Sequence, residues 1–416
     1  MPVIEKPKLR FVEAFPVQHD GRQTIMLRDP LRWTENILFV PVGLLPILRR
    51  FDGTNSVLDI QAEIMRRSGQ LVPGEFLHGI VAKLDEGLML DSPRFHEHCE
   101  RLVREFRESP VRPAANAGTS YPSEPDKISA MFNSHFLAAG DPNGGGAKDR
   151  TRGQIVGLIA PHIDLRRGGV SFARAYQQLH ERDEIELFVI LGTGHQPMKH
   201  RFGGIRKDYA TPLGVAKTDP EAMQTLAAGL PFDFFEDQWA HRSEHSIEFQ
   251  VVYLQYLFGG KLNARIVPVL VGSFHEFAET GASPAADTEV ATFTKALRQL
   301  MDANRGHVCV IAGVDFAHIG GRFGDDESMD GARRVRLEGE DRAMLDAIVS
   351  CNAESFHRNI TADKNARRVC GYPAIYTLLA ALQPSSARFL HYDQSHEPET
   401  NSVVSFGSVA FYGGNG

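Results

Sequence analysis

The sequence is poor in cysteine, and its few cysteines are far apart. Cys99, Cys309, Cys351 and Cys370 form no C-x-x-C motif, and four are too few for a disulfide framework in a chain of 416 residues. The pattern argues against a structural zinc knuckle. We therefore expect any metal ion to be held mainly by histidine, aspartate or glutamate.

Long apolar segments and excess positive charge are also lacking. No apolar run is long enough to span a bilayer, and the first residues lack the apolar core of a signal peptide. The formal net charge is −7, which gives no electrostatic support for binding a polyanion. We therefore expect a cytoplasmic protein that binds neither nucleic acid nor a membrane.

Short apolar runs alternate with helix-like segments from residue 154 onward. The runs are rich in β-branched residues and bounded by Gly or Pro, as is typical of strands buried on both faces. The alternation predicts an α/β domain with a mixed, mostly parallel sheet flanked by helices. Within the run at residues 264–271, Pro268 cannot donate a ladder hydrogen bond and predicts an edge strand or a bulge.

A smaller domain is predicted before the α/β domain. Residues 1–24 show no periodic pattern and are expected to form an arm, and residues 93–110 a charged linker helix before the main domain at residues 111–416. Two helices and a short apolar strand at residues 25–92 predict a small winged-helix-like α+β unit. Its F-D-G and L-D-E-G-L motifs resemble the PqqD-type peptide-binding modules, which implies a peptide partner; a purely packing role is the alternative.

Polar side chains follow three of the predicted strands. His162 and His195 each come directly after a buried run, and Asp315 and His318 follow the run at residues 308–312. Ligands of open α/β sheets collect just beyond the carboxyl ends of the strands, so these side chains are expected in one crevice. A single histidine at a strand end is usually structural, but the recurrence favours a site for Fe(II), Cu or Zn.

The residues leave the third ligand open among His318, Asp315 and His245. His245 lies at the expected start of a helix, whose dipole would keep the imidazole neutral, as a metal ligand or a catalytic hydrogen-bonding group requires. A solvated polar residue at a helix start is the alternative. The preceding Glu244 is a candidate general base, or simply a partner of the helix dipole.

Other features allow two interpretations each. Gly192 and Gly194 in L-G-T-G-H only weakly suggest a phosphate loop, because no third glycine or lysine follows. Arg166 is a candidate for binding an anionic substrate group, or an exposed cation. Cys370 lies at an expected helix start, which can activate a thiol, although a buried inert cysteine is more common.

Several motifs, in order along the chain, resemble the Memo family. They are A-G-T-S-Y-P, which contains Tyr121, then I-A-P-H, I-L-G-T-G-H, Y-A-T-P-L-G, S-E-H-S-I-E-F-Q, I-V-P-V-L-V-G, D-F-A-H and V-C-G-Y-P-A-I. The likeness runs from about residue 111 to the C-terminus and leaves out the first hundred residues. It implies the fold of class III extradiol dioxygenases, which use a non-heme Fe(II) held by two histidines and a carboxylate.

The resemblance also implies iron or copper binding and redox activity, with ligands at His162 and His195. The cysteine of the D-F-C-H motif in animal members falls on Ala317 here, so His318 or Asp315 would have to complete the site. In prokaryotes the family is linked to a radical SAM protein and an AMMECR-type protein, which are therefore expected partners.

The residues and the resemblance together predict a dioxygenase-like oxidoreductase acting on a small organic or peptidyl substrate. Fe(II) is the favoured ion, with Cu or Zn as alternatives. A zinc-dependent hydrolase and a non-catalytic peptide- or anion-binding module are the alternative functions. The predicted metal ligands are His162, His195 and His318, the acid–base groups His245, Glu244 and Asp315, and the substrate-binding residues Arg166, Tyr121 and Cys370.

Overall fold

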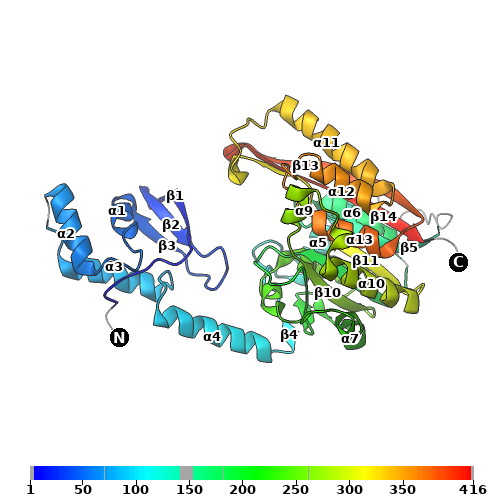
Figure 1. Ribbon diagram of the computed structural model, residues 1–416, viewed down its shortest axis with the longest axis horizontal. Coiled ribbons are helices and arrows are strands. Elements are labelled where there is room, and N and C mark those ends of the chain that lie inside the picture. Colours follow the sequence, from blue (N-terminus) through cyan, green and yellow to red (C-terminus); the bar gives the residue numbers. More distant parts are fainter. Residues whose placement is uncertain (1–3, 70, 141–152, 181, 261, 414–416) are drawn as a thin grey trace. The chain divides into compact units, whose positions relative to one another are not determined.

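The computed structural model describes residues 4–69, 71–140, 153–180, 182–260 and 262–413. The chain divides into two compact units, Met1–Glu108 and Ser109–Gly416 (Figure 1). The larger unit is the α/β domain that the sequence predicts, and the smaller one contains a small antiparallel sheet followed by helices. Each unit is described on its own below.

The smaller unit begins with a three-stranded antiparallel sheet, in the order β1-β2-β3. Apolar residues of the sheet pack with those of the following helices in a separate core that includes Leu27, Val40 and Leu84. The strands and helices are β1 (Glu13–His19), β2 (Arg22–Arg28), β3 (Leu38–Pro41), α1 (Leu45–Leu48), α2 (Val57–Ser68), α3 (Gly74–Glu86) and α4 (Pro93–Glu108).

Two expectations for this unit need correction. The arm expected over residues 1–24 contains β1, because Asp20 and Gly21 both take positive φ angles (48° and 72°) and join β1 to β2 in a tight hairpin turn. The strand expected after the second helix is reduced to a single bridge between Leu9 and Leu90, so the sheet precedes the helices instead of following them. The likeness to PqqD-type modules stays a prediction.

The larger unit is built on an eight-stranded mixed sheet in the order β12-β14-β5-β11-β6-β10-β7, with β13 paired to β14. The four central strands are parallel and are buried on both faces, as their apolar runs predict. They are β5 (Gln154–Ala160), β11 (Val308–Gly313), β6 (Leu187–Thr193) and β10 (Arg265–Val271).

Antiparallel strands complete the sheet on either side of this parallel centre, which confirms a mixed α/β fold. They are β7 (Phe202–Gly204), β12 (His318–Gly320), β13 (Ser386–Glu397) and β14 (Ser402–Gly413). A second, three-stranded sheet is formed by β4 (Val111–Arg112), β8 (Asp208–Thr211) and β9 (Gly214–Ala216).

Helices cover both faces of the large sheet (Figure 1). Side chains of a strand alternate between the faces. Val310 and Ala312 of β11 join a core with residues of α13 (Tyr372–Leu382) and α10 (Thr288–Ala303), whereas a Cβ atom on Gly313 would face α8 (His245–Leu257) on the other side. The helices are α5 (Pro125–Ala138), α6 (Gly169–Tyr176), α7 (Pro220–Ala228), α8 (His245–Leu257), α9 (His275–Thr280), α10 (Thr288–Ala303), α11 (Gly331–Val349), α12 (Ala353–Thr361) and α13 (Tyr372–Leu382). Among the helices of the described residues, none combines the length and apolar character needed to cross a bilayer.

Pro268 lies within β10, which is neither an edge strand nor bulged. The neighbouring β7 pairs only with residues 269–271, after the proline. The missing N–H group of Pro268 therefore interrupts no pairing with β7, and the expectation of an edge strand or a bulge is corrected.

Two glycines allow α8 to approach the sheet closely. A Cβ atom on Gly192 of β6 would lie 2.6 Å from both Cγ1 of Ile247 and Oγ of Ser246. A Cβ atom on Gly313 of β11 would lie 2.6 Å from the backbone oxygen of Ser246. In L-G-T-G-H, Gly192 therefore serves helix packing, and the phosphate-loop interpretation is not needed.

We predict that Gly313→Ala destabilises the protein by about 1–3 kcal/mol, because the added methyl group meets a backbone atom that cannot turn away. Gly339→Ala is the matched control: Gly339 is exposed in the middle of α11 with open space around it, and alanine should stabilise that helix by about 0.5–1 kcal/mol. Chemical denaturation measures both. Equal stabilities for the two variants would contradict the close packing of α8.

Candidate metal centre

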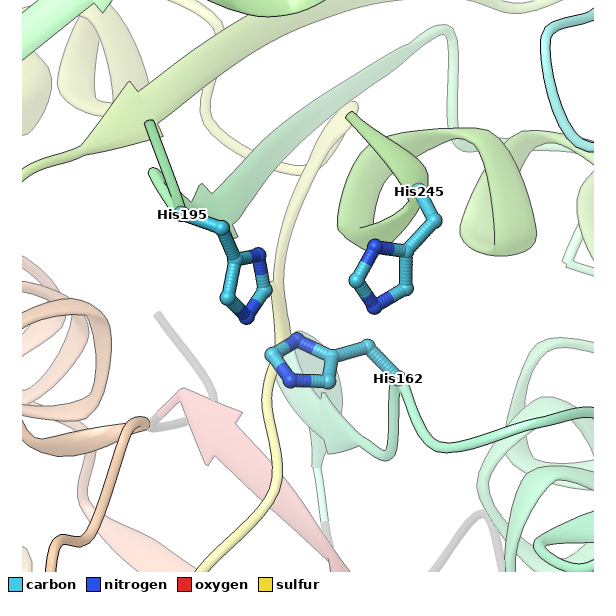
Figure 2. A group of neighbouring side chains, drawn as sticks. All are labelled: His162, His195 and His245. Atoms are coloured by element: carbon cyan, nitrogen blue, oxygen red, sulfur yellow. The ribbon is translucent and has the colours of Figure 1, made fainter. Parts of the chain in front are cut away.

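Three histidines meet at the carboxyl ends of the central strands. His162 lies two residues after β5, His195 two residues after β6, and His245 is the first residue of α8. Figure 2 shows the three rings pointing toward one another. One ring nitrogen from each histidine lies within 4.8 Å of the others, and the ring centroids are 4.8 to 5.1 Å apart. The three histidines therefore form a cluster that could hold a metal ion.

In each of the three rings, Nδ1 faces an oxygen acceptor. Nδ1 of His162 lies 3.0 Å from the carbonyl oxygen of Gly313, to which it donates. Nδ1 of His195 lies 3.0 Å from both carboxylate oxygens of Glu244, and Nδ1 of His245 lies 3.2 Å from Oε1 of the same carboxylate. With Nδ1 occupied in this way, Nε2 is the atom that remains to bind a ligand.

Glu244 is the buried group that orients two of these rings. Its side chain is only 2% exposed and caps α8, accepting hydrogen bonds from the backbone N–H groups of His245 and Ser246 at 2.8 and 2.9 Å. It also accepts the backbone N–H of His195 at 3.2 Å. Burial raises the pKa of Glu244, but His195 and His245 outweigh burial and hold it well below its usual range, so the group is ionised.

Burial and neighbouring charge give His162 and His195 different protonation preferences. Burial lowers the pKa of His162 far below its usual value, and the neighbouring imidazoles lower it further, so His162 is neutral at pH 7. Burial also lowers the pKa of His195, but the carboxylates of Glu244 and Asp315 together raise it by more, and the net pKa lies above its usual value. A metal ion would have to displace a proton from His195 more often than from His162.

Asp315 lies beside the three histidines. Its Oδ1 accepts hydrogen bonds from the backbone N–H groups of His162 and Ile163, both at 3.0 Å, and its Oδ2 lies 3.7 Å from Nε2 of His162. Burial raises the pKa of this carboxyl to about 7, despite the two hydrogen bonds, which lower it. A proton can therefore be exchanged at this carboxyl near neutral pH.

His318 is close to the three histidines but lies outside the group whose nitrogens converge. Its Nδ1 donates to the carbonyl oxygen of Phe316 at 3.1 Å, and burial lowers its pKa to about 4. The sequence analysis predicted His318 as the third metal ligand and His245 as an acid–base group. In the structure, it is His245 whose ring nitrogen lies near those of His162 and His195. Whether His318 binds metal stays a prediction.

The predicted substrate-binding residues lie in three different settings. Arg166 is exposed, and Tyr121 is buried with its hydroxyl donating to Oε1 of Glu248 at 2.6 Å. Sγ of Cys370 lies 3.4 Å from Nε2 of His162. Burial raises the pKa of this thiol, so the helix start does not activate it in the metal-free protein. Of these three residues, Cys370 contacts the histidine group.

The sequence interpretation missed a buried ion pair between Arg112 and Glu248, both fully buried. The guanidinium also donates to the backbone oxygens of His241, at 3.0 Å, and Glu244, at 2.7 Å. Arg112 therefore holds the chain just before α8 in place. The position of Glu248 one helical turn after Glu244 in S-E-H-S-I-E-F-Q was the available signal, but its partner lies 136 residues away in the sequence.

Two cavities adjoin the centre. One, of about 690 Å³, is lined by Thr193, Gly194 and Cys370 among others, and includes Lys364 and Arg368 on its wall. The other, of about 620 Å³, reaches His195 and has a wall of charged residues. Both have the size of a site for a small molecule.

A family model described as Memo-like protein matches residues 112–410, which is well over half of the chain. The chain belongs to the Memo family. The matched region begins in β4, ends within β14 and contains all three histidines of the centre. The Memo region thus corresponds to the larger structural unit.

Curated relatives extend the likeness beyond that region. A MEMO1 family protein of Aquifex aeolicus is 28% identical over 410 residues, covering 98% of this chain and 100% of the relative. One from Thermus thermophilus is 28% identical over 359 residues, covering 84% of this chain and 97% of the relative. One from Thermoplasma acidophilum is 24% identical over 303 residues, which is 72% of this chain but 97% of the relative. The Memo family therefore also includes shorter proteins.

We predict that Arg112→Met destabilises this Memo protein by about 3–5 kcal/mol, because Glu248 is left as an uncompensated buried charge. Arg305→Met is the control, since Arg305 pairs with Asp302 in an exposed ion pair, which contributes about 0–1 kcal/mol. Denaturant titrations of the two variants should differ accordingly. A loss below about 1 kcal/mol for Arg112→Met would show that the buried pair does not fix the start of α8.

Proposed function

We propose that this Memo protein binds a metal ion through Nε2 of His162, His195 and His245, and that the ion serves oxidoreductase chemistry. The arrangement of the rings supports the proposal: each Nδ1 faces an oxygen acceptor, and one nitrogen of each ring lies near those of the other two. Holding three imidazoles in this orientation is how proteins prepare histidines to bind a metal.

The donor set fits some ions better than others. Imidazole nitrogens suit Fe(II), Cu and Zn, whereas Mg²⁺ and Ca²⁺ prefer oxygen ligands. Three histidines leave coordination positions open on an ion that takes four or more ligands, as a catalytic centre requires. Fe(II) is the favoured ion because the resemblance to the Memo family implies a fold of the extradiol dioxygenase type, and that fold would imply oxygen chemistry.

When bound, the ion would bring O₂ and the substrate together and pass electrons between them. Asp315 would accept or return a proton at Oδ2, because its pKa of about 7 allows both states near neutral pH. Glu244 would hold His195 and His245 in place without exchanging protons. The cavity of about 690 Å³ beside Cys370 would admit a small organic molecule or the end of a peptide. A radical SAM protein and an AMMECR-type protein are the proposed partners.

The first test is the metal content of protein purified without oxygen, measured by mass spectrometry. We expect near-stoichiometric iron or copper in the wild type and a loss of metal in His162→Ala, His195→Ala and His245→Ala. His307→Ala is the control, because His307 is exposed on another part of the domain and should keep the metal. Wild-type protein that stays empty after incubation with Fe(II), Cu and Zn would overturn the proposal.

Two further readouts sharpen this test. If His318→Ala loses the metal and His245→Ala keeps it, the third ligand is His318 and not His245. Substrate-dependent oxygen uptake by the iron-loaded protein, in a screen of small phenols and peptides, would support the oxidoreductase. Hydrolysis by the zinc-loaded protein without oxygen uptake would contradict it.

A second prediction concerns pH. Burial lowers the pKa of His195, but Glu244, with a contribution from Asp315, raises it by more, so a metal ion competes with a proton at this ring. Metal affinity should be constant above this raised pKa and fall about tenfold per pH unit below it. Glu244→Gln should move this onset to lower pH and weaken binding at high pH by about 10–100-fold. Calorimetric Co²⁺ titrations at several pH values measure both effects, and identical pH profiles would contradict the role of Glu244.

A further inference from the structure

The buried amide of Gln250 connects the chain at two of the three histidines. Gln250 lies in α8, one turn after Ser246, and its side chain is fully buried. Its Nε2 donates to the backbone oxygens of Pro161, at 2.9 Å, and of Ser246, at 3.1 Å. Pro161 comes directly before His162, and Ser246 comes directly after His245. One amide group therefore ties the backbone beside His162 to the backbone beside His245.

Hydrogen bonding fixes which way round this amide lies. The backbone oxygens of Pro161 and Ser246 can only accept hydrogen bonds, so the NH₂ group faces them and uses both of its N–H donors. The remaining Oε1 faces Tyr176 of α6, whose buried hydroxyl donates to it at 2.8 Å. The amide of Gln250 cannot turn without breaking several hydrogen bonds away from solvent, and it is therefore held in one orientation.

The sheet leaves room for the amide beside the histidines. A Cβ atom on Gly313 of β11 would lie 2.7 Å from Nε2 of Gln250, so glycine lets the amide lie against the strand. The backbone oxygen of the same glycine accepts a hydrogen bond from Nδ1 of His162 at 3.0 Å. The end of β11 therefore orients the ring of His162, while Gln250 holds the residue before it.

The amide acts where the carboxylate of Glu244 does not. The hydrogen bonds of Glu244 join His195 to His245, so the position of the third ring must be set by other groups. Two acceptors of one amide nitrogen lie roughly 5 Å apart, so Gln250 fixes how closely the chain before His162 approaches the first turn of α8. The ring centroids of His162 and His245 are 5.1 Å apart, and a shift of the backbone at either place would change this distance.

We propose that Gln250 is a positioning residue that sets the distance between His162 and His245, and with it the metal affinity of the centre. The inference rests on the proposed function, since it needs the three-histidine centre. Gln250 acts through the backbone of Pro161 and Ser246 and supplies no ligand atom. An apolar side chain of the same length would fill the space without the cost of burying an amide, but the oxygen of Pro161 would lose this donor.

The test compares Gln250→Met with Gln255→Met in anaerobic Co²⁺ titrations of the full-length protein. Methionine keeps the length of the side chain but cannot donate a hydrogen bond. We expect Gln250→Met to lower the Co²⁺ affinity by about 10–100-fold. The visible absorption bands of bound Co²⁺ should also change, because they report how its ligands are arranged.

Gln255→Met is the matched control, because Gln255 is also a buried amide of α8. Its Oε1 accepts a hydrogen bond from the hydroxyl of Thr211, and the residue lies about 15 Å further along the helix than His245. The control therefore loses a buried hydrogen bond of a similar kind, but one that does not involve the chain at the histidines. We expect it to keep the Co²⁺ affinity and the spectrum of the wild type.

A smaller change tests the same connection. Tyr176→Phe removes the hydroxyl that holds Oε1 of Gln250 and keeps the aromatic ring. We expect a smaller loss of Co²⁺ affinity than in Gln250→Met, with a change of the absorption bands in the same direction. Chemical denaturation without metal measures the stability of every variant. The spectrum separates positioning from stability, because a protein that is only less stable binds Co²⁺ with an unchanged arrangement of ligands.

The outcomes separate this inference from the proposed function. If Gln250→Met and Tyr176→Phe bind Co²⁺ with the affinity and spectrum of the wild type, Gln250 does not position the histidines. An equal effect of Gln255→Met would also overturn the inference, since loss of stability alone would then explain the result. Wild-type protein that binds no Co²⁺ would overturn the three-histidine centre itself. If Gln250→Met fails to fold, Tyr176→Phe decides, because wild-type values contradict the inference and a lower affinity with altered bands supports it.

Discussion

The buried carboxylate of Glu244 is the group on which the candidate metal centre depends. It joins two parts of the Memo domain, because it caps α8 and also accepts hydrogen bonds from the ring and backbone of His195. A buried carboxylate is costly unless hydrogen bonds and positive charge surround it, and a helix N-terminus offers both. The same contacts that keep Glu244 ionised also aim His195 and His245 at His162.

The position of Glu244 depends in turn on how closely α8 approaches the sheet. Gly192 and Gly313 leave room for the first turn of the helix, and Arg112 ties the backbone just before it to Glu248 inside the helix. The geometry of the histidines is thus supported by packing and by a buried ion pair. Support of this kind fixes side chains before a ligand arrives, which lowers the entropic cost of binding.

The charges around the histidines are arranged to receive a cation. The imidazoles supply nitrogen donors without negative charge, so the compensating charge comes from the ionised Glu244. Asp315 and the thiol of Cys370 are protonated more readily than usual because they are buried, but a neighbouring cation would favour their anionic forms. An ion would therefore change the protonation of the very groups that surround it.

The sequence by itself determined the parallel centre of the sheet and placed His162 and His195 beyond its strands, because apolar runs and strand ends are local patterns. Local signals were also present where a prediction was wrong: the Asp20–Gly21 pair marks the hairpin that replaces the expected arm. Only the tertiary structure brought His245 to the other two histidines. That choice depends on the long-range packing of α8 against two glycines, and no spacing along the chain encodes it.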